Sequence, residues 1–249
     1  MTPFTRLSTS AGLAVPWHKA RNVPVFFERN AAFVHLPRTA GTSVMASLAA
    51  SGEAAFAGRG LWELFKQYAD PGAIVRAVRE NFYLTTLRDF PQQHLPASAL
   101  RLLVGSPAWE QLYTFAFVRN PWDLVVSTFE FARRDAEIDR RRGADPDRVE
   151  LIDRSPTFAR FVELYPAMRS DMTSMLCDRA GQSLVTFVGR YEALDAGFAT
   201  VCAHVGLRAA LPQTNASERR DYRSYYDDRT RAVVERHFAR DIERWGYVF

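Results

Sequence analysis

The sequence has few cysteines and no long apolar run. Of its 249 residues only two are cysteine, Cys177 and Cys202, which are too few for a disulfide framework and are not spaced as metal ligands. No stretch approaches the roughly 20 apolar residues that a membrane span needs, and the start of the chain lacks the continuous apolar core of a secretory signal. We therefore expect a reduced, cytoplasmic protein with buried thiols.

The charge balance is only mildly basic. The 32 basic residues, nearly all arginine, exceed the 28 acidic ones by four, which favours anionic partners weakly. The arginines alternate with Asp and Glu and no nucleic-acid-binding motif occurs, so we expect no nucleic-acid partner. Hydrophobic residues make up 47% of the chain, as in an ordinary soluble globular protein.

The chain reads as one domain, residues 1–249. It has no internal repeat, no low-complexity tract and no Gly/Ser linker that would separate two units. In the segment 133–156 charge is dense and apolar periodicity lapses. This segment is a candidate mobile insertion that acts as a lid or binds the acceptor, and the alternative is a solvated helix end followed by a loop.

Apolar runs alternate with segments of helical spacing, which favours a parallel sheet with crossover helices. Strands are expected at 31–36, 82–87, 112–118 and 184–189. Helices are expected at 42–50, 61–69, 71–80, 97–104, from Pro121 onward, at 192–205, and as one long amphipathic helix within 225–249. The sequence thus predicts an α/β fold.

The first strand leads into the turn HLPRTAGTS, directly before a predicted helix. Backbone N–H groups at a helix N-terminus favour a phosphate. Gly41 lets the backbone approach such a ligand, while Thr39, Thr42 and Ser43 add hydroxyl donors and Arg38 adds a planar, permanently charged donor. The alternative is a helix capped by Thr or Ser with an incidental arginine.

A second anion site is indicated by FAFVRNPWDLVVSTFEF, residues 115–131. Arg119 directly follows a predicted strand, and ligands of open α/β sheets bind at the carboxyl ends of the strands. Ser127 lies about two turns along the next helix, where we expect it to donate to the same phosphate. The alternative is a salt bridge between Arg119 and Asp123. Two such sites predict a ligand with two separated phosphate-like groups.

These residues carry a family resemblance. VHLPRTAGTS resembles the 5′-phosphosulfate loop of sulfotransferases, and FAFVRNPWDLVVSTF resembles their 3′-phosphate motif. The pair is similar to the carbohydrate-type branch related to heparan and chondroitin sulfotransferases, and FVGRYEAL, NASERRDYRSYYDD and DIERWGYVF are similar to segments of its bacterial members. The resemblance runs from about residue 31 to the end. It implies a three-layer, P-loop-like nucleotide-binding fold whose central parallel sheet is flanked by helices.

The resemblance also implies a donor and an acceptor. The donor is 3′-phosphoadenosine 5′-phosphosulfate (PAPS), the product is adenosine 3′,5′-bisphosphate, and the acceptor is a hydroxyl, on a carbohydrate or another alcohol. Residues that match the family's 5′-phosphosulfate loop are Arg38, Thr39, Ala40, Gly41, Thr42 and Ser43, and those that match its 3′-phosphate motif are Arg119 and Ser127. Arg38 stands where the loop usually carries Lys, so we expect it to supply charge to the departing phosphate oxygen.

The reaction needs a base that takes the proton of the acceptor hydroxyl, and histidine suits that task near neutral pH. The five candidates are His18, His35, His94, His204 and His237. His94, on a loop before a helix and ahead of the 3′-phosphate motif, resembles the family's base. The alternatives are that His94 is a loop or capping residue and that Glu53 or Glu63 is the base.

Competing interpretations fit less well. TLRDFP resembles a second 3′-phosphate motif, but Pro96 stands eight positions after Arg88, where a hydroxyl is needed. A P-loop kinase would need G-x-x-x-x-G-K-[ST] and an acidic Mg²⁺ ligand, both missing here, so no metal is expected. A non-catalytic nucleotide-binding protein stays open. Further candidates are Arg190, Arg219 and Arg220 as anion contacts, and Trp62, Phe65 and Tyr68 as a sugar platform or as core.

Overall fold

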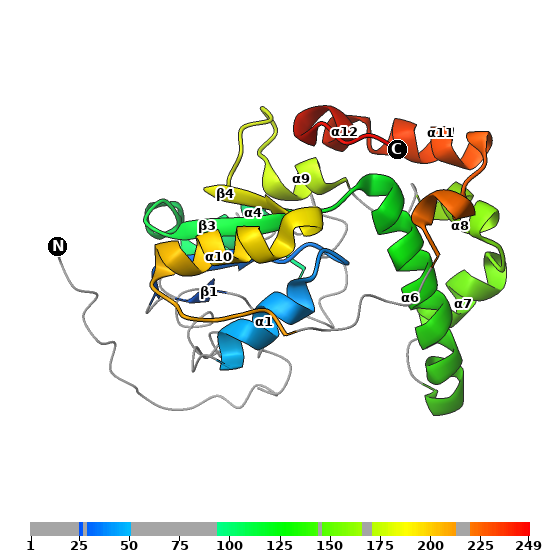
Figure 1. Ribbon diagram of the computed structural model, residues 1–249, viewed down its shortest axis with the longest axis horizontal. Helices are drawn as coiled ribbons and strands as arrows, with labels where there is room; N and C mark the ends of the chain where they lie inside the picture. The colour runs from blue at the N-terminus through cyan, green and yellow to red at the C-terminus, as the bar shows by residue number, and fades with distance from the viewer. Residues whose placement is uncertain (1–24, 27–28, 51–93, 144–145, 166–170, 213–219) are drawn as a thin grey trace.

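The fold is given by a computed structural model, which describes residues 25–26, 29–50, 94–143, 146–165, 171–212 and 220–249 (Figure 1). Within these residues the chain forms a four-stranded sheet in the order β1-β2-β3-β4. Three strands are parallel, and β1 pairs with β2 in the antiparallel direction. The strands are β1 (Val25–Phe26), β2 (Ala31–Val34), β3 (Tyr113–Val118) and β4 (Phe187–Arg190).

The register of the parallel strands brings their carboxyl ends to one edge of the sheet. Val34 pairs with Ala116, and Val118 pairs with Arg190. The segments that follow β2, β3 and β4 therefore start beside one another. This edge is where an open α/β sheet binds its ligands.

Helices surround the sheet. They are α1 (Gly41–Ala50), α4 (Ala97–Val104), α5 (Ser106–Trp109), α6 (Pro121–Arg142), α7 (Pro146–Arg154), α8 (Phe158–Leu164), α9 (Met172–Leu176), α10 (Leu194–Val205), α11 (Asp228–His237) and α12 (Ala239–Trp245). Short 3₁₀ turns precede α10 and α11, at Tyr191–Ala193 and Tyr222–Tyr225. Among these described helices, none is long and apolar enough to cross a membrane.

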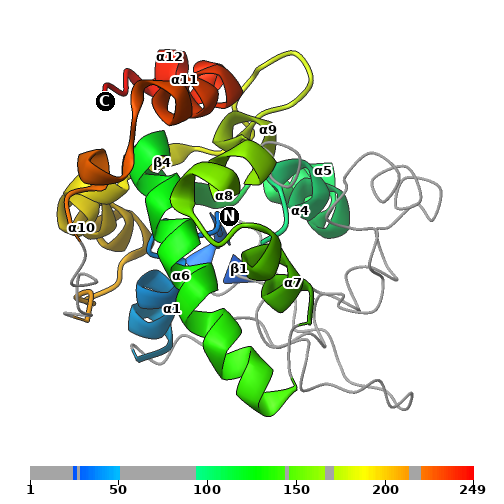
Figure 2. The same ribbon diagram turned by 90° about the vertical axis from the view of Figure 1, so that its right-hand side faces the viewer.

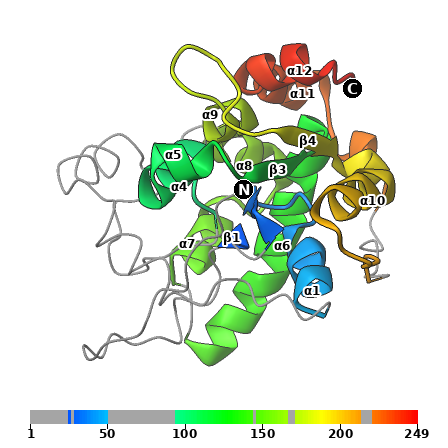
Figure 3. The same cartoon turned by 90° about the vertical axis from the view of Figure 1, so that its left-hand side faces the viewer.

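Alternate residues of the strands supply two apolar cores, one on each face of the sheet. Phe33, Phe115 and Phe117 pack with Phe198 of α10 and Val44 of α1. The intervening residues of β2 and β3 join a second core with α4, α6, α8, α9 and α11. Figure 3 shows α1 and α10 on one side of the sheet and α4 and α5 on the other.

Most strands and helices that fall on described residues are confirmed. The predicted strands 31–36 and 112–118 contain all of β2 and all of β3, and the helix 97–104 is α4. The strand predicted at 184–189 begins only at Phe187, because the amide of Leu184 donates to Leu176 instead. The predicted elements 61–69, 71–80 and 82–87 lie outside the described residues.

The prediction of one long helix near the end of the chain is wrong. The segment forms α11 and α12, which are separated at Phe238, where φ is −101° and ψ is 21°. The ring of Phe238 is 1% exposed. Val234 of α11, Phe238 at the break and Asp241 of α12 are all buried.

The charged segment 133–156 is mostly helical. Residues up to Arg142 continue α6, Gly143 ends that helix with φ of 60°, and α7 packs back against α6 (Figure 2). Ala136 and Ile152 share a small apolar core, and Arg148 donates to Asp139 across 2.9 Å. A helical hairpin therefore replaces the expected loop, and a mobile role for it stays a prediction.

Asp241 joins the terminal helix α12 to the start of α9. Its carboxylate accepts hydrogen bonds from the amides of Met172 (2.8 Å) and Thr173 (2.7 Å) and from the Thr173 hydroxyl (2.6 Å). The side chain is fully buried. Burial raises the pKa of Asp241 to about 6, against the lowering effect of these three hydrogen bonds.

We predict that Asp241→Ala lowers the free energy of unfolding by about 3 kcal/mol, because three buried donors lose their acceptor. Urea unfolding at neutral pH measures the change. Glu243→Ala, at an exposed position of the same helix, is the control and should cost less than about 0.5 kcal/mol. Equal losses in the two variants would contradict this role of Asp241.

Candidate functional site

The loop between β2 and α1 has an unusual backbone. Arg38 and Ala40 adopt left-handed conformations, with φ of 63° and 68°. Non-glycine residues rarely do so, and the strain concentrates at ligand sites. The buried Thr39 hydroxyl holds the turn by donating to the carbonyl of Leu36 across 3.0 Å. Alternating right- and left-handed residues form concavities of N–H groups that bind anions.

Gly41 leaves room for an imidazole ring. A Cβ atom at position 41 would lie 1.7 Å from Nε2 of His35. The His35 ring is 4% exposed and stacks on Phe33, with 5.3 Å between ring centroids. The glycine is therefore required by packing inside the loop, in addition to any ligand.

His35 and His94 form a pair beside this loop. Nδ1 of His94 lies 2.9 Å from the carbonyl oxygen of His35, and the two rings meet edge to face at 4.4 Å. A carbonyl only accepts, so Nδ1 of His94 carries a hydrogen and the lone pair of the neutral ring is on Nε2. Burial, and next the charge of His94, lower the pKa of His35 to about 3. His35 is therefore neutral at physiological pH.

Arg119 extends from the end of β3 into the space between β2 and α6. Its Nε donates to Asp123 (2.7 Å), and its Nη1 donates to the carbonyl of Arg38 (2.8 Å) and to Oγ of Ser127 (3.1 Å). Its guanidinium carbon lies 3.8 Å from the centroid of the Tyr191 ring. The alternative interpretation, a salt bridge with Asp123, is therefore present, and a phosphate site at Arg119 and Ser127 stays a prediction.

The side chain of Arg38 lies in the same cluster. Its Nε and Nη2 lie 3.4 and 3.3 Å from Oγ of Ser127, and its guanidinium lies over the Phe131 ring at 4.3 Å. The sequence motif predicts Arg38 within the phosphosulfate loop, but it does not predict that the side chain contacts Ser127 and Phe131. The motifs give no signal for Phe131 or Tyr191 either, although both residues occur within the motif segments.

The N-terminus of α6 is tied to the end of the chain. The Asn120 side chain caps α6 by accepting from the amide of Trp122 (3.1 Å), and its Nδ2 donates to the carbonyl of Val248 (2.9 Å). The Asn120 amide donates to Glu192 across 2.6 Å. The segment after β4 and the terminal residues therefore both support the start of the helix that carries Ser127.

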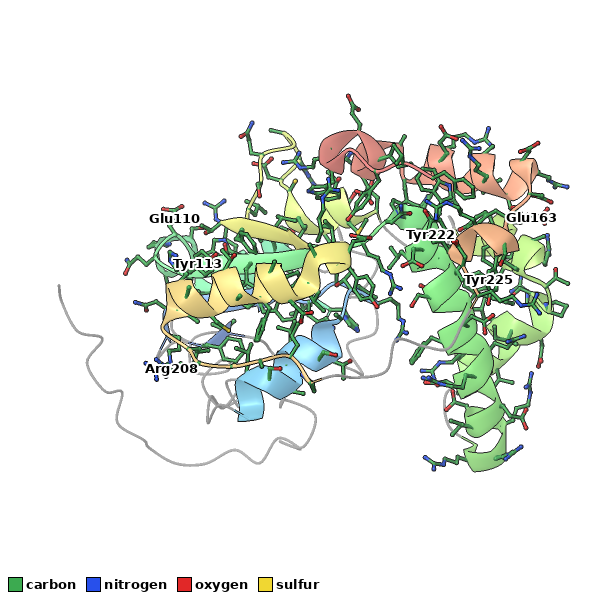
Figure 4. The ribbon with its side chains drawn as sticks, viewed as in Figure 1. Glu110, Tyr113, Glu163, Arg208, Tyr222 and Tyr225 are labelled. Atoms are coloured by element: carbon green, nitrogen blue, oxygen red, sulfur yellow. The ribbon has the colours of Figure 1, made fainter. Side chains whose placement is uncertain are left out.

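The remaining candidates are placed differently. Thr42 is exposed and Ser43 half-buried in the first turn of α1. His204 stacks on Tyr113 at 3.7 Å, at the end of β3 opposite Arg119, as the label of Tyr113 in Figure 4 shows. Arg190 donates to the carbonyl of Trp245 and stacks on Tyr247. Candidates outside the described residues are His18, Glu53, Glu63, Trp62, Phe65, Tyr68, Arg88 and Arg219.

Comparison with protein families assigns the chain. The model of the Sulfotransferase family matches residues 25–248. The chain therefore belongs to the sulfotransferase family, which is a family of enzymes that transfer a sulfuryl group from PAPS. The α/β architecture with a mostly parallel sheet is consistent with the P-loop-like fold of that family. A search of curated proteins finds no match.

We predict that Gly41→Ala disrupts the loop, because the new methyl group and the His35 ring would occupy the same space. The expected loss is at least about 2 kcal/mol of unfolding free energy, as for other overpacked cores. Ala46→Gly, at an exposed position of the same helix, is a control that should cost only about 1 kcal/mol. Urea unfolding compares them, and a fully stable Gly41→Ala would refute the packing argument.

Proposed function

We propose that this protein transfers the sulfuryl group of PAPS to an acceptor hydroxyl with His94 as general base. The family supports the reaction, and one observation carries the assignment of the base: the 2.9 Å hydrogen bond from His94 to the carbonyl of His35. That bond holds the imidazole next to the loop that precedes α1 and puts the lone pair of the neutral ring on Nε2. Proximity of this kind is the first requirement for a general base.

The residues of the site fit a donor with two phosphate groups. The left-handed loop and the N-terminus of α1 suit the 5′-phosphosulfate, held by residues 38–43 through backbone amides and the hydroxyls of Thr42 and Ser43. Arg119 and Ser127, on the neighbouring strand end and helix, suit the 3′-phosphate. The two sites are joined by the hydrogen bond from Arg119 to the carbonyl of Arg38.

When bound, the donor supplies a sulfuryl group activated by its phosphate leaving group. His94 takes the proton of the acceptor hydroxyl at Nε2 and becomes an imidazolium. Its Nδ1–H donates to the carbonyl of His35, which stabilises that positive charge. His35 adds no competing charge, because its own pKa lies near 3. The partial positive charge at the N-terminus of α1 favours the departing anion.

The finer features of the proposal rest on the motifs. VHLPRTAGTS and FAFVRNPWDLVVSTF support the carbohydrate-type branch, so we propose a carbohydrate hydroxyl, or that of another alcohol, as acceptor, in a cytoplasmic bacterial enzyme. Within the described residues no group of His, Cys, Asp and Glu is arranged to hold a metal. The alternatives are a non-catalytic nucleotide-binding protein and a P-loop-type kinase.

A thermal-shift titration tests the donor. Adenosine 3′,5′-bisphosphate, the expected product, should stabilise the fold, by about 2.7 kcal/mol at about 100 times its dissociation constant. AMP and ATP–Mg²⁺ are the parallel ligands, and both should stabilise less. An equal response to ATP–Mg²⁺ would favour the kinase alternative, and no response to any of the three would contradict the proposal.

We predict that His94→Ala lowers turnover about 100- to 10,000-fold, the usual contribution of a general base, while affinity for the bisphosphate changes little. Release of adenosine 3′,5′-bisphosphate from PAPS in the presence of an acceptor measures turnover, and calorimetry measures affinity. His204→Ala removes a histidine at the opposite end of β3 and should keep parental turnover. Loss of donor affinity without loss of turnover in His94→Ala would exclude His94 as the base.

A further inference from the structure

The geometry points to a role for Arg38 that differs from the one its place in the loop suggests. We infer that the guanidinium groups of Arg38 and Arg119 bind one phosphate together, so that Arg38 recognises the 3′-phosphate monoester of the donor. This inference rests on the proposed function, because it concerns the nucleotide of that same site. It makes Arg38 a determinant of donor specificity, whereas its backbone stays part of the loop around the 5′ group.

Both arginines point at the same hydroxyl. Oγ of Ser127 lies 3.1 Å from Nη1 of Arg119 and 3.3 Å from Nη2 of Arg38. Two guanidinium groups that converge on one point create a region rich in donors and positive charge. A phosphate monoester, with three terminal oxygens and up to two negative charges, is the chemical group that such a cluster matches.

The direction of Arg38 is held by its backbone and by a ring of α6. The left-handed conformation, with φ of 63°, and the hydrogen bond from Arg119 to the Arg38 carbonyl fix where the side chain starts. The guanidinium then lies 4.3 Å from the Phe131 ring. Phe131 and Ser127 are one helical turn apart on the same face of α6. The Phe131 ring therefore lies under the guanidinium, and the Ser127 hydroxyl accepts its hydrogen bonds.

The charge of Arg38 lacks the partner that Arg119 has. Arg119 forms an ion pair with Asp123 at 2.7 Å, while Arg38 forms no ion pair within the described part of the chain. Burial, and then the charges of Arg119 and Arg134, lower the pKa of Arg38, and Asp135 opposes this less strongly. The cluster therefore carries an excess positive charge in a half-buried place, and binding a dianion there relieves the repulsion between the arginines.

Binding of three nucleotides distinguishes whether Arg38 contacts the 3′-phosphate or the 5′ group. Calorimetry measures the binding of adenosine 3′,5′-bisphosphate, 3′-AMP and 5′-AMP to the parent and to Arg38→Gln. We expect Arg38→Gln to weaken both 3′-phosphorylated nucleotides about ten- to a hundredfold, the size of a lost charge-assisted contact. The affinity for 5′-AMP should change less than about twofold.

Matched variants control for charge and folding. Arg133→Gln also removes one positive charge, but from an α6 side chain that is 61% exposed and pairs with Glu130. This variant should leave all three affinities near parental values. Ser127→Ala should have the same pattern as Arg38→Gln: weaker binding of the two 3′-phosphorylated nucleotides and a nearly unchanged affinity for 5′-AMP. Arg38→Lys retains the charge and serves if the glutamine variant does not fold, with a smaller loss confined to the 3′-phosphorylated nucleotides.

Two results overturn the inference in distinguishable ways. Equal weakening of 5′-AMP and the bisphosphate in Arg38→Gln would assign Arg38 to the 5′ group and leave the proposed function standing. A parent protein that binds 5′-AMP as tightly as the bisphosphate would remove the 3′-phosphate site itself, and the proposed function with it.

Discussion

The guanidinium group of Arg119 is the contact on which the geometry of the site depends. It joins three segments that are distant in sequence: the loop after β2 through the carbonyl of Arg38, α6 through Asp123 and Ser127, and the turn after β4 through the Tyr191 ring. The residue is 4% exposed, so these interactions replace its contacts with water. Arg119 thus links these three segments at the edge of the sheet where the parallel strands end.

In the proposed reaction, the site separates proton transfer from charge recognition. On one side of the loop, the hydrogen bond from His94 to the His35 carbonyl puts the lone pair of the neutral His94 ring on Nε2, and burial keeps His35 neutral. On the other side, Arg38 and Arg119 gather positive charge around Ser127. The strained loop contacts both parts, because Gly41 packs on the His35 ring and the Arg38 carbonyl accepts a hydrogen bond from Arg119.

Sequence patterns predicted the elements that carry a strong local signal. The apolar runs of β2 and β3 and the helical spacing after Pro121 are local, so they were recognised without tertiary information. The positions of Arg119 and Ser127 followed from strand ends and helical periodicity. His94 was selected by its likeness to a family motif, and the structure adds its contact with His35.

Other features depend on contacts between distant segments. The break at Phe238 falls in a segment without glycine or proline, and α7 is a helix that packs on α6 although its own sequence is rich in charge. The direction of Arg38 depends on Phe131 from another helix and on a left-handed backbone that non-glycine residues seldom adopt. The need for glycine at position 41 follows from the His35 ring, six residues earlier. No pattern within a few residues contains that information.

The measurement that tests the account most directly is a crystal structure of the protein with adenosine 3′,5′-bisphosphate. We expect the 5′-phosphate at the N-terminus of α1, and the 3′-phosphate in contact with Arg119, Ser127 and the Arg38 guanidinium. A bisphosphate bound away from the carboxyl ends of β2 and β3, or one with its two phosphates exchanged between these positions, would contradict it.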